Sequence, residues 1–144
     1  MPHRKITKLD RKPGLYLQHT ATKGRGLFCT SDIKAGERLE VTPAIIMNDK
    51  ESPDIEDTIL ADYVFKIGKM SKWLRKHAGV KKIDDVNCVV MGITSYCNHD
   101  ENPNAEVLWD EENGSLLYIL EATRFIPKHT EICTSYGDEW FADR

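Results

Sequence analysis

Residues 105–119, AEVLWDEENGSLLYI, place two short, mostly apolar runs on either side of a polar turn. Within that turn, Asn113-Gly114 is a pair that accepts the positive backbone φ angles required by tight hairpin turns. The stretch therefore predicts a β-hairpin whose strands lie at residues 105–109 and 115–119.

Comparable runs recur along the whole chain and are separated by turn residues. Such spacing is typical of a protein built from many short strands. We therefore expect a mostly β fold with short helices, in which the strands lie at residues 15–17, 26–30, 38–47, 63–67, 105–109, 115–122 and 131–135.

Only residues 71–78, SKWLRKHA, have a clearly helical pattern. Ser71 is suited to cap the N-terminus of this helix, and Gly79 is suited to end it. The spacing places on one helix face the side chains of Trp73, Leu74 and His77. Residues 49–57, which contain a proline and several acids, are expected to form a polar loop.

The chain has 144 residues, enough for one domain with its own core. Its net charge of −3 gives no overall positive field, so we expect neither direct nucleic-acid binding nor association with an anionic membrane. The apolar runs are far shorter than the ~20 residues of a membrane-spanning helix, and residues 1–12 lack the apolar segment of a secretory signal. We expect a soluble, intracellular protein.

The cysteines contain no C-x-x-C pair; they are Cys29, Cys88, Cys97 and Cys133. Structural zinc sites usually draw their ligands from such close pairs, so we expect no metal. Each cysteine has apolar neighbours, which indicates buried free thiols in a reducing compartment.

Two segments group residues suited to binding. In residues 23–28, KGRGLF, glycines flank Arg25, which suits either a tight turn or close approach to a ligand; the dinucleotide-binding pattern is not matched. Residues 96–104, YCNHDENPN, can satisfy their own backbone through Asx turns, and they offer too few neighbouring ligands for a metal. A thiol–imidazole pair is disfavoured, because Cys97 and His99 would face opposite sides of an extended chain.

A third segment, residues 131–141, EICTSYGDEWF, runs from a predicted strand into Tyr136, a glycine and two large aromatic residues. Taken in order, the three segments resemble the SET-domain protein lysine methyltransferases, and the resemblance extends from Tyr16 to Phe141. It is greatest to compact viral and bacterial members without zinc-binding flanks. The matching pieces are Gly24-Arg25-Gly26-Leu27-Phe28, Asp32-Ile33 with Gly36-Glu37, Asp62-Tyr63-Val64-Phe65, Asn98-His99 with Pro103-Asn104, Ala122-Thr123-Arg124-Phe125-Ile126, and Glu131-Ile132 with Tyr136-Gly137.

The resemblance implies a SET fold, β-clip-like, in which several small sheets surround a C-terminal pseudoknot and residues 96–104 lie beside residues 131–141. It divides the chain into a basic N-terminal tail, residues 1–13, and a catalytic domain, residues 14–144. It also implies S-adenosyl-L-methionine as the methyl donor, without a metal, and a substrate lysine that enters through a narrow channel from the opposite face.

By the same resemblance, the catalytic residues are Tyr136, whose hydroxyl would orient the lysine amine, and Tyr63, which would line the lysine channel. Because the ordinary pKa of a tyrosine is ~10, we expect an orienting and electrostatic role for Tyr136, with proton loss through water. The implied cofactor-binding residues are Lys23, Gly24, Arg25, Gly26, Asn98, His99, Tyr136, Trp140 and Phe141.

The resemblance also implies how these residues meet the cofactor. The Gly24 and Gly26 backbone would reach its methionine end, and Arg25 would lie along the nucleoside. The Asn98 side chain would hold the amino-acid moiety, and the His99 backbone would read the adenine edge. The adenine would be covered by an aromatic lid of Trp140 and Phe141.

Two positions depart from the family pattern. Asp100 stands where Ser or Cys usually follows Asn-His, and we expect its carboxylate to favour a cationic cofactor. His129 replaces the usual turn glycine, and we expect it to alter only a surface turn. Arg124 and Glu131 are expected to hold the fold together.

We therefore expect an S-adenosylmethionine-dependent protein-lysine N-methyltransferase that acts on a histone tail or another basic peptide, with the nucleus or chromatin as one place of action. One alternative is a non-catalytic SET-like module that binds a peptide by strand addition at a sheet edge. Another is a metal- or thiol-dependent hydrolase built on Cys97, His99 and Asp100. The sequence leaves the oligomeric state open, a homodimer included.

Overall fold

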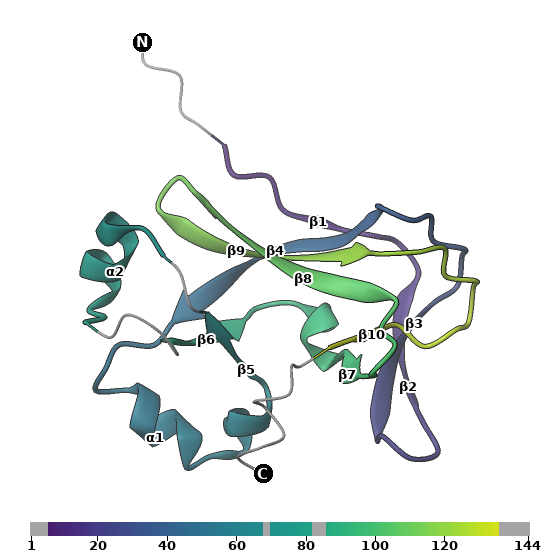
Figure 1. The fold of residues 1–144 in the computed structure, drawn as a ribbon, viewed down its shortest axis with the longest axis horizontal. Coiled ribbons are helices and arrows are strands. Elements are labelled where there is room, and N and C mark those ends of the chain that lie inside the picture. Colours follow the sequence, from purple (N-terminus) through teal and green to yellow (C-terminus); the bar gives the residue numbers. More distant parts are fainter. Residues whose placement is uncertain (1–5, 68–69, 82–85, 136–144) are drawn as a thin grey trace. The chain divides into compact units, whose positions relative to one another are not determined.

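The computed structural model describes residues 6–67, 70–81 and 86–135. Most of its regular elements are strands, which confirms the predicted mostly β fold class (Figure 1). The elements are β1 (Asp10–Arg11), β2 (Leu15–His19), β3 (Arg25–Cys29), β4 (Arg38–Ile46), α1 (Ser52–Glu56), the 3₁₀ helix η1 (Ile59–Asp62), β5 (Val64–Ile67), α2 (Lys72–Ala78), β6 (Val86–Val90), the 3₁₀ helix η2 (Ile93–Tyr96), β7 (Asn98–His99), β8 (Ala105–Glu112), β9 (Ser115–Ala122) and β10 (Cys133–Thr134).

Each predicted run contains a strand of the structure, although the last one is limited to the two residues of β10. The predicted hairpin is present as β8 and β9, and its turn has φ angles of 51° at Asn113 and 81° at Gly114. Strand β6 was not predicted. Four of its five residues are buried, including the polar Asn87, so the run lacks the alternation of a half-exposed strand.

The chain forms two compact units. Among the described residues, the first unit takes those within 6–9, 42–95 and 109–118, and the second takes those within 10–41, 96–108 and 119–135. Strands β4, β8 and β9 each run from one unit into the other. In the largest sheet, hydrogen bonding follows the order β5-β6-β4-β9-β8, with β1 also paired to β4.

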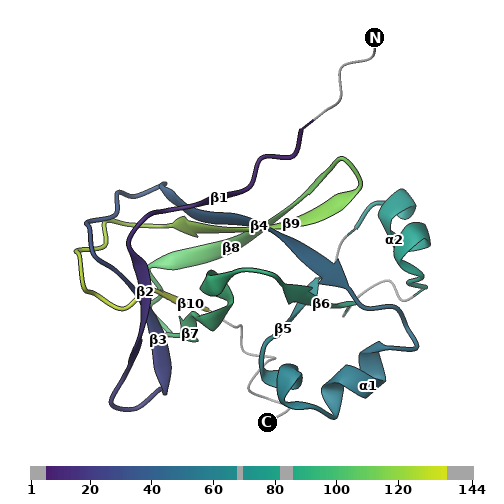
Figure 2. The same ribbon diagram turned by 180° about the vertical axis from the view of Figure 1, so that it is seen from behind.

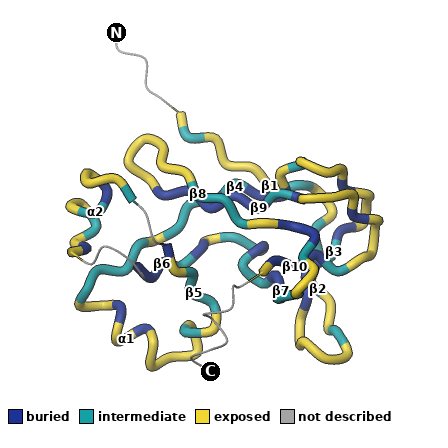
Figure 3. The backbone as a smooth tube through the Cα atoms, viewed as in Figure 1, coloured by how far each residue is buried: buried dark blue, intermediate teal, exposed yellow. Residues whose placement is uncertain are grey.

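The core of the first unit forms around β6, which pairs antiparallel with both β5 and the end of β4. Cys88 is fully buried and lies opposite Phe65 on one side and Ile46 on the other. Figure 3 shows how buried and exposed residues are distributed along the backbone. The buried cluster consists of Ile67, Leu74, Val80, Val86, Cys88 and Leu116.

Helix α2 has the predicted caps and a single buried side chain, that of Leu74. The Ser71 hydroxyl accepts the Leu74 N–H, and Gly79 ends the helix in the left-handed conformation. Leu74 is buried, whereas Trp73 is 54% exposed and its ring stacks on His77 at 3.8 Å between centroids. Trp73 and His77 therefore share one helix face, as the spacing predicts, although only Leu74 of the three reaches the core.

Residues 49–57 do not form the polar loop that their composition predicts, because five of them fold into α1. The Asn48 side chain holds the turn that precedes the helix: its Oδ1 accepts the N–H groups of Lys50 and Glu51. Ile55 is buried, which gives this short helix an anchored side. Within the described ranges, no helix is long and apolar enough to cross a membrane.

The end of the predicted N-terminal tail is tied to β4 in the second unit. Asp10 and Arg11 form β1, and the Arg11 Nε lies 2.7 Å from the carboxylate of Glu40, which is only 2% exposed. Lys12 forms an ion pair with Glu37 at the start of the same strand. These pairings hold residues 10–12 against β4.

Two small sheets build the rest of the second unit (Figure 2). Strands β2 and β3 form an antiparallel hairpin, and β7 pairs in parallel with β10. An isolated bridge joins Leu27 of β3 to Ile132, just before β10. Residues from three distant parts of the chain therefore meet at β3, β7 and β10, which confirms the expected proximity of residues 96–104 to residues 131–135; residues 136–141 of the same segment lie outside the described part.

Candidate functional site

The parallel pairing of β7 with β10 brings the second and third candidate segments together. Asn98 lies opposite Cys133, and His99 lies opposite Thr134. The chain leaves β10 toward Tyr136, one residue beyond the described part. Tyr136, Trp140 and Phe141 lie outside the described residues, so their predicted roles stay predictions.

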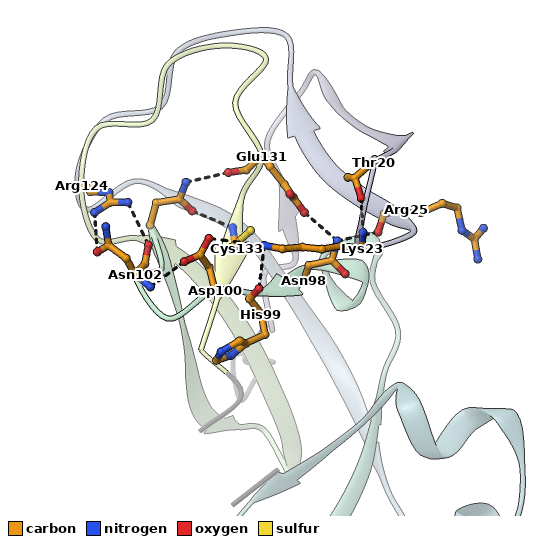
Figure 4. Close-up of polar contacts among 11 residues, drawn as sticks. Thr20, Lys23, Arg25, Asn98, His99, Asp100, Asn102, Arg124, Glu131 and Cys133 are labelled. Atoms are coloured by element: carbon orange, nitrogen blue, oxygen red, sulfur yellow. Dashed lines mark hydrogen bonds and ion pairs between the residues drawn. The ribbon is translucent and has the colours of Figure 1, made fainter. Parts of the chain in front are cut away.

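The carboxamide of Asn98 has a fixed orientation (Figure 4). Its Nδ2 donates to the Arg25 carbonyl oxygen at 3.0 Å and to the Glu131 Oε2 at 2.8 Å. Both amide hydrogens are therefore used. The Oδ1 is left as a hydrogen-bond acceptor, for which the described part of the chain provides no partner.

The two glycines around Arg25 meet different requirements. Gly24 has a φ of 70°, and a Cβ there would touch nothing within 4 Å, so the turn itself needs the glycine. Its carbonyl accepts the N–H and the hydroxyl of Thr20. Gly26 is crowded instead: a Cβ would lie 2.6 Å from Glu131 Oε2 and 2.9 Å from Thr20 Cγ2.

Lys23 places a positive charge beside β7. Its Nζ donates to the His99 carbonyl oxygen at 3.1 Å and lies 3.6 Å from the Asp100 carboxylate. The pKa of Asp100 is lowered, first by the hydrogen bond from the Asn102 N–H and further by the charge of Lys23. Asp100 therefore serves as an anionic anchor for Lys23.

The guanidinium of Arg25 lies over the ring of Tyr96, 4.9 Å from its centroid. In Figure 4 its side chain extends away from the Asn98–Glu131 pair. A cation held on an aromatic face in this way keeps N–H groups available to solvent or a ligand. The predicted place of Arg25 along the cofactor's nucleoside is not tested by this arrangement.

Two further side chains, those of Asn104 and Arg124, stabilise this part of the second unit. Asn104 is 8% exposed; its Nδ2 donates to the Glu131 carbonyl oxygen, and its Oδ1 accepts the Cys133 N–H, both at 2.9 Å. Arg124 donates to the side chain and the carbonyl oxygen of Asn102. Sequence reasoning missed the role of Asn104; its position after Pro103 was the only available signal.

The thiols are not arranged for nucleophilic chemistry. All four cysteines are free and buried. Burial raises the pKa of Cys97 well above its ordinary value and raises the pKa of Cys133 to about 12. Because the thiolate is the reactive form, these shifts oppose a hydrolase built on Cys97. Within residues 6–67, 70–81 and 86–135, no three His, Cys, Asp or Glu side chains are grouped to hold a metal ion.

The other predicted catalytic tyrosine, Tyr63, belongs to the first unit. It follows η1, and its N–H donates to the Leu60 carbonyl oxygen. Thr58 begins this 3₁₀ helix by accepting the Leu60 N–H with its hydroxyl. Tyr63 is half-buried, and the exposed Asp62 precedes it.

The turn residue His129 has the conformation of a glycine. Its φ of 61° lies in the left-handed region, which is unfavourable for a side chain of this size. Its Nδ1 lies 2.7 Å from the Tyr16 hydroxyl, and the two rings are in contact. This interaction explains how the turn accommodates a histidine.

Comparisons with known proteins agree with the resemblance to SET-domain proteins. The family model for the SET domain matches residues 24–137. The chain is 29% identical over 131 residues to a Schizosaccharomyces pombe histone-lysine N-methyltransferase specific for H3 lysine 37, covering 90% of this chain and 78% of that protein.

Two solved structures are also similar. One is a Plasmodium falciparum protein assigned as a histone methyltransferase, with a TM-score of 0.66, 26% identity, and coverage of 90% of this chain and 98% of that one. The other is a Neurospora SET-domain histone lysine methyltransferase, with a TM-score of 0.65, 22% identity, and coverage of 89% and 54%, respectively.

Proposed function

Because the chain belongs to the SET-domain family, we propose that it is an S-adenosylmethionine-dependent protein-lysine N-methyltransferase. The observation that carries the proposal is the arrangement of Asn98. Its carboxamide exposes only an acceptor. Asn98 lies opposite Cys133, three residues before Tyr136, and the next residue, His99, accepts from the Lys23 ammonium.

The chemistry of these residues suits the cofactor's amino-acid end, which carries an ammonium and a carboxylate. Asn98 Oδ1 can accept from the ammonium, and Lys23 can pair with the carboxylate. The resemblance assigns the adenine edge to the His99 backbone, whose carbonyl oxygen accepts from Lys23. The cofactor, when bound, supplies an activated methyl group on a sulfonium.

Two tyrosines of this chain would act on the substrate lysine. A lysine amine must be neutral before it can accept a methyl group, so its proton leaves through water. The Tyr136 hydroxyl orients the amine, and Tyr63 lines the channel and limits how many methyl groups fit beside it. Alignment of the amine and exclusion of water supply the rate enhancement that this arrangement can give.

We propose a basic peptide, and in particular a histone tail, as the substrate. The S. pombe relative is named for a histone lysine, and exposed acids precede Tyr63 in the first unit, namely Asp54, Asp57 and Asp62. A negative segment attracts a lysine-rich peptide and becomes less effective at high salt. Action on histones would place the protein at chromatin in the nucleus, and light scattering would show whether it works as a homodimer.

The test is methyl transfer from labelled S-adenosylmethionine to core histones and an array of histone peptides, read by mass spectrometry. We expect mass increases at one or a few lysines, and a loss of at least about 100-fold in Tyr136→Phe, as expected for a group that acts in the reaction. Tyr16→Phe is the matched control, because Tyr16 contacts His129 and not the proposed site.

One outcome would contradict the proposed reaction, and another would contradict only the proposed role of Tyr136. A chain that binds histone peptides but transfers no methyl group would be a peptide-binding module. Equal rates for Tyr136→Phe and the unaltered chain would refute the role of Tyr136 while leaving the reaction intact.

A further inference from the structure

We propose that Glu131 is a positioning residue for cofactor binding: it holds the Asn98 carboxamide so that Oδ1, and not Nδ2, faces the cofactor's ammonium. This inference rests on the proposed function, because it assumes that Asn98 contacts that ammonium. It concerns a residue that touches Asn98 rather than the cofactor.

The first step is the donor and acceptor count. An ionised carboxylate only accepts hydrogen bonds, and so does a backbone carbonyl. Asn98 faces one of each, Glu131 Oε2 at 2.8 Å and the Arg25 oxygen at 3.0 Å. A flipped carboxamide would set its oxygen against both acceptors. The two acceptors together therefore select one of the two orientations.

The second step is the contribution of Glu131 to that choice. The bond to the Arg25 oxygen alone uses one amide hydrogen and leaves the second one free to approach a ligand. The Glu131 carboxylate takes this second hydrogen in a bond of 2.8 Å. Without it, an N–H dipole can turn toward the site and repel an ammonium.

The third step is how Glu131 itself is held. Its carbonyl oxygen accepts from Asn104 Nδ2 at 2.9 Å. The close approach of its Oε2 to Gly26 is possible only because position 26 has no side chain. Because Gly26 has no Cβ, there is room for the Glu131 carboxylate to contact Asn98.

The test measures ligand binding, not activity. The full chain is titrated calorimetrically with S-adenosylhomocysteine and with its deaminated analogue, in which hydrogen replaces the α-ammonium. The ratio of the two dissociation constants reports the contact with the ammonium alone. A merely structural change at Glu131 would weaken both ligands and leave this ratio unchanged.

Two variants separate position from charge. Glu131→Gln keeps an acceptor at the same reach but removes the charge, whereas Glu131→Asp keeps the charge but shortens the side chain by one methylene. Glu121→Gln is the matched control, since Glu121 is in the same unit and pairs with Arg38 instead. Thermal melting confirms that each variant is folded.

We expect the unaltered chain to prefer S-adenosylhomocysteine over the analogue by about tenfold or more, as for a hydrogen bond to a charged group. Glu131→Gln and Glu121→Gln should keep most of that preference. Glu131→Asp should lose most of it, with the affinity for the analogue unchanged within about twofold.

The opposite pattern, in which Asp keeps the preference and Gln loses it, would show that Glu131 acts through its charge and would overturn the inference. An unchanged ratio in both variants would overturn it as well. If the unaltered chain does not bind S-adenosylhomocysteine at all, the proposed function fails together with the inference, whereas binding without a preference refutes only the ammonium contact.

Discussion

The side chain of Asn104 bonds to the backbone of residues 131 and 133 in the way that a neighbouring strand would. It accepts the Cys133 N–H at 2.9 Å and donates to the Glu131 carbonyl oxygen at the same distance. Asn104 N–H also donates to the Cys133 carbonyl oxygen at 3.2 Å. One buried carboxamide therefore satisfies backbone groups on both sides of Ile132, where the chain approaches β10.

This geometry predicts that Asn104 contributes to the stability of the fold. Asn104→Ala should lower the free energy of unfolding by about 2–4 kcal/mol, because two backbone groups lose their partners in a buried place. Urea unfolding followed by circular dichroism measures the loss. Asn102→Ala is the control, since Asn102 is exposed and should cost less than about 1 kcal/mol. Equal effects of the two variants would contradict this account.

Lys23→Met should weaken binding of S-adenosylhomocysteine several-fold and leave folding almost unchanged. Methionine keeps the length and apolar character of the stem but removes the ammonium that bonds to His99 and Asp100. Because the group is exposed, the effect should shrink when salt is raised from about 0.05 to 0.5 M. Lys128→Met is the matched control, and calorimetry at both salt concentrations is the measurement. A salt-independent loss would show that the ammonium does not act through charge.

Gly24→Ala and Gly26→Ala should separate two kinds of defect. At Gly24 there is room for a methyl group but the φ is 70°, so the cost is backbone strain of about 1 kcal/mol, measured by thermal unfolding. At Gly26 the methyl group meets Glu131, so affinity for S-adenosylhomocysteine should fall as well. Gly24→Asn should recover part of the stability, because asparagine tolerates this conformation better. Equal ligand affinity in the two alanine variants would refute the distinction.

The Lys12–Glu37 ion pair should make stability depend on pH. The hydrogen bond from Lys12 lowers the pKa of Glu37 in the folded chain, whereas the unfolded chain titrates at the ordinary value of about 4.3. The pair therefore contributes stability fully above that value and loses it as pH falls through the folded pKa. Glu37→Gln should be less stable than the unaltered chain at pH 7, and the difference should shrink as the pH falls below about 4.3 in urea unfolding. Lys12→Met should reproduce this dependence, and a difference that does not shrink as the pH falls below the ordinary pKa would contradict it.

Local signals predicted much of the fold. The hairpin of β8 and β9 was predicted because its turn chemistry and its two runs are contiguous in sequence. The caps of α2 were predicted for the same reason, since Ser71 bonds to Leu74 three residues later. Neither feature needs information from distant residues.

Three features were missed because their causes are not local. Trp73 stays exposed beside the hairpin turn: a Cβ on Gly114 would lie 2.9 Å from its ring, a contact invisible in the helical pattern. Helix α1 forms in a polar segment because Ile55 finds a buried place. Strand β6 was not predicted because its polar residue Asn87 is buried, which removes the alternation of polar and apolar positions. The Asn87 Nδ2 donates to Glu56.

The candidate site also has features that the sequence predicts and features that only the tertiary structure decides. The sequence alone determined which residue types are present and in what order, from the glycines around Arg25 through Asn98-His99 to Tyr136, and hence the family resemblance. The tertiary structure decided what each group does: Asn98 presents an acceptor only because Arg25, 73 residues before it, and Glu131, 33 residues after it, take its two hydrogens. Hydrogen-bond partners so far apart meet through the pairing of β7 with β10 and the bridge from Leu27 to Ile132, and short-range patterns carry no information about which distant strands will pair.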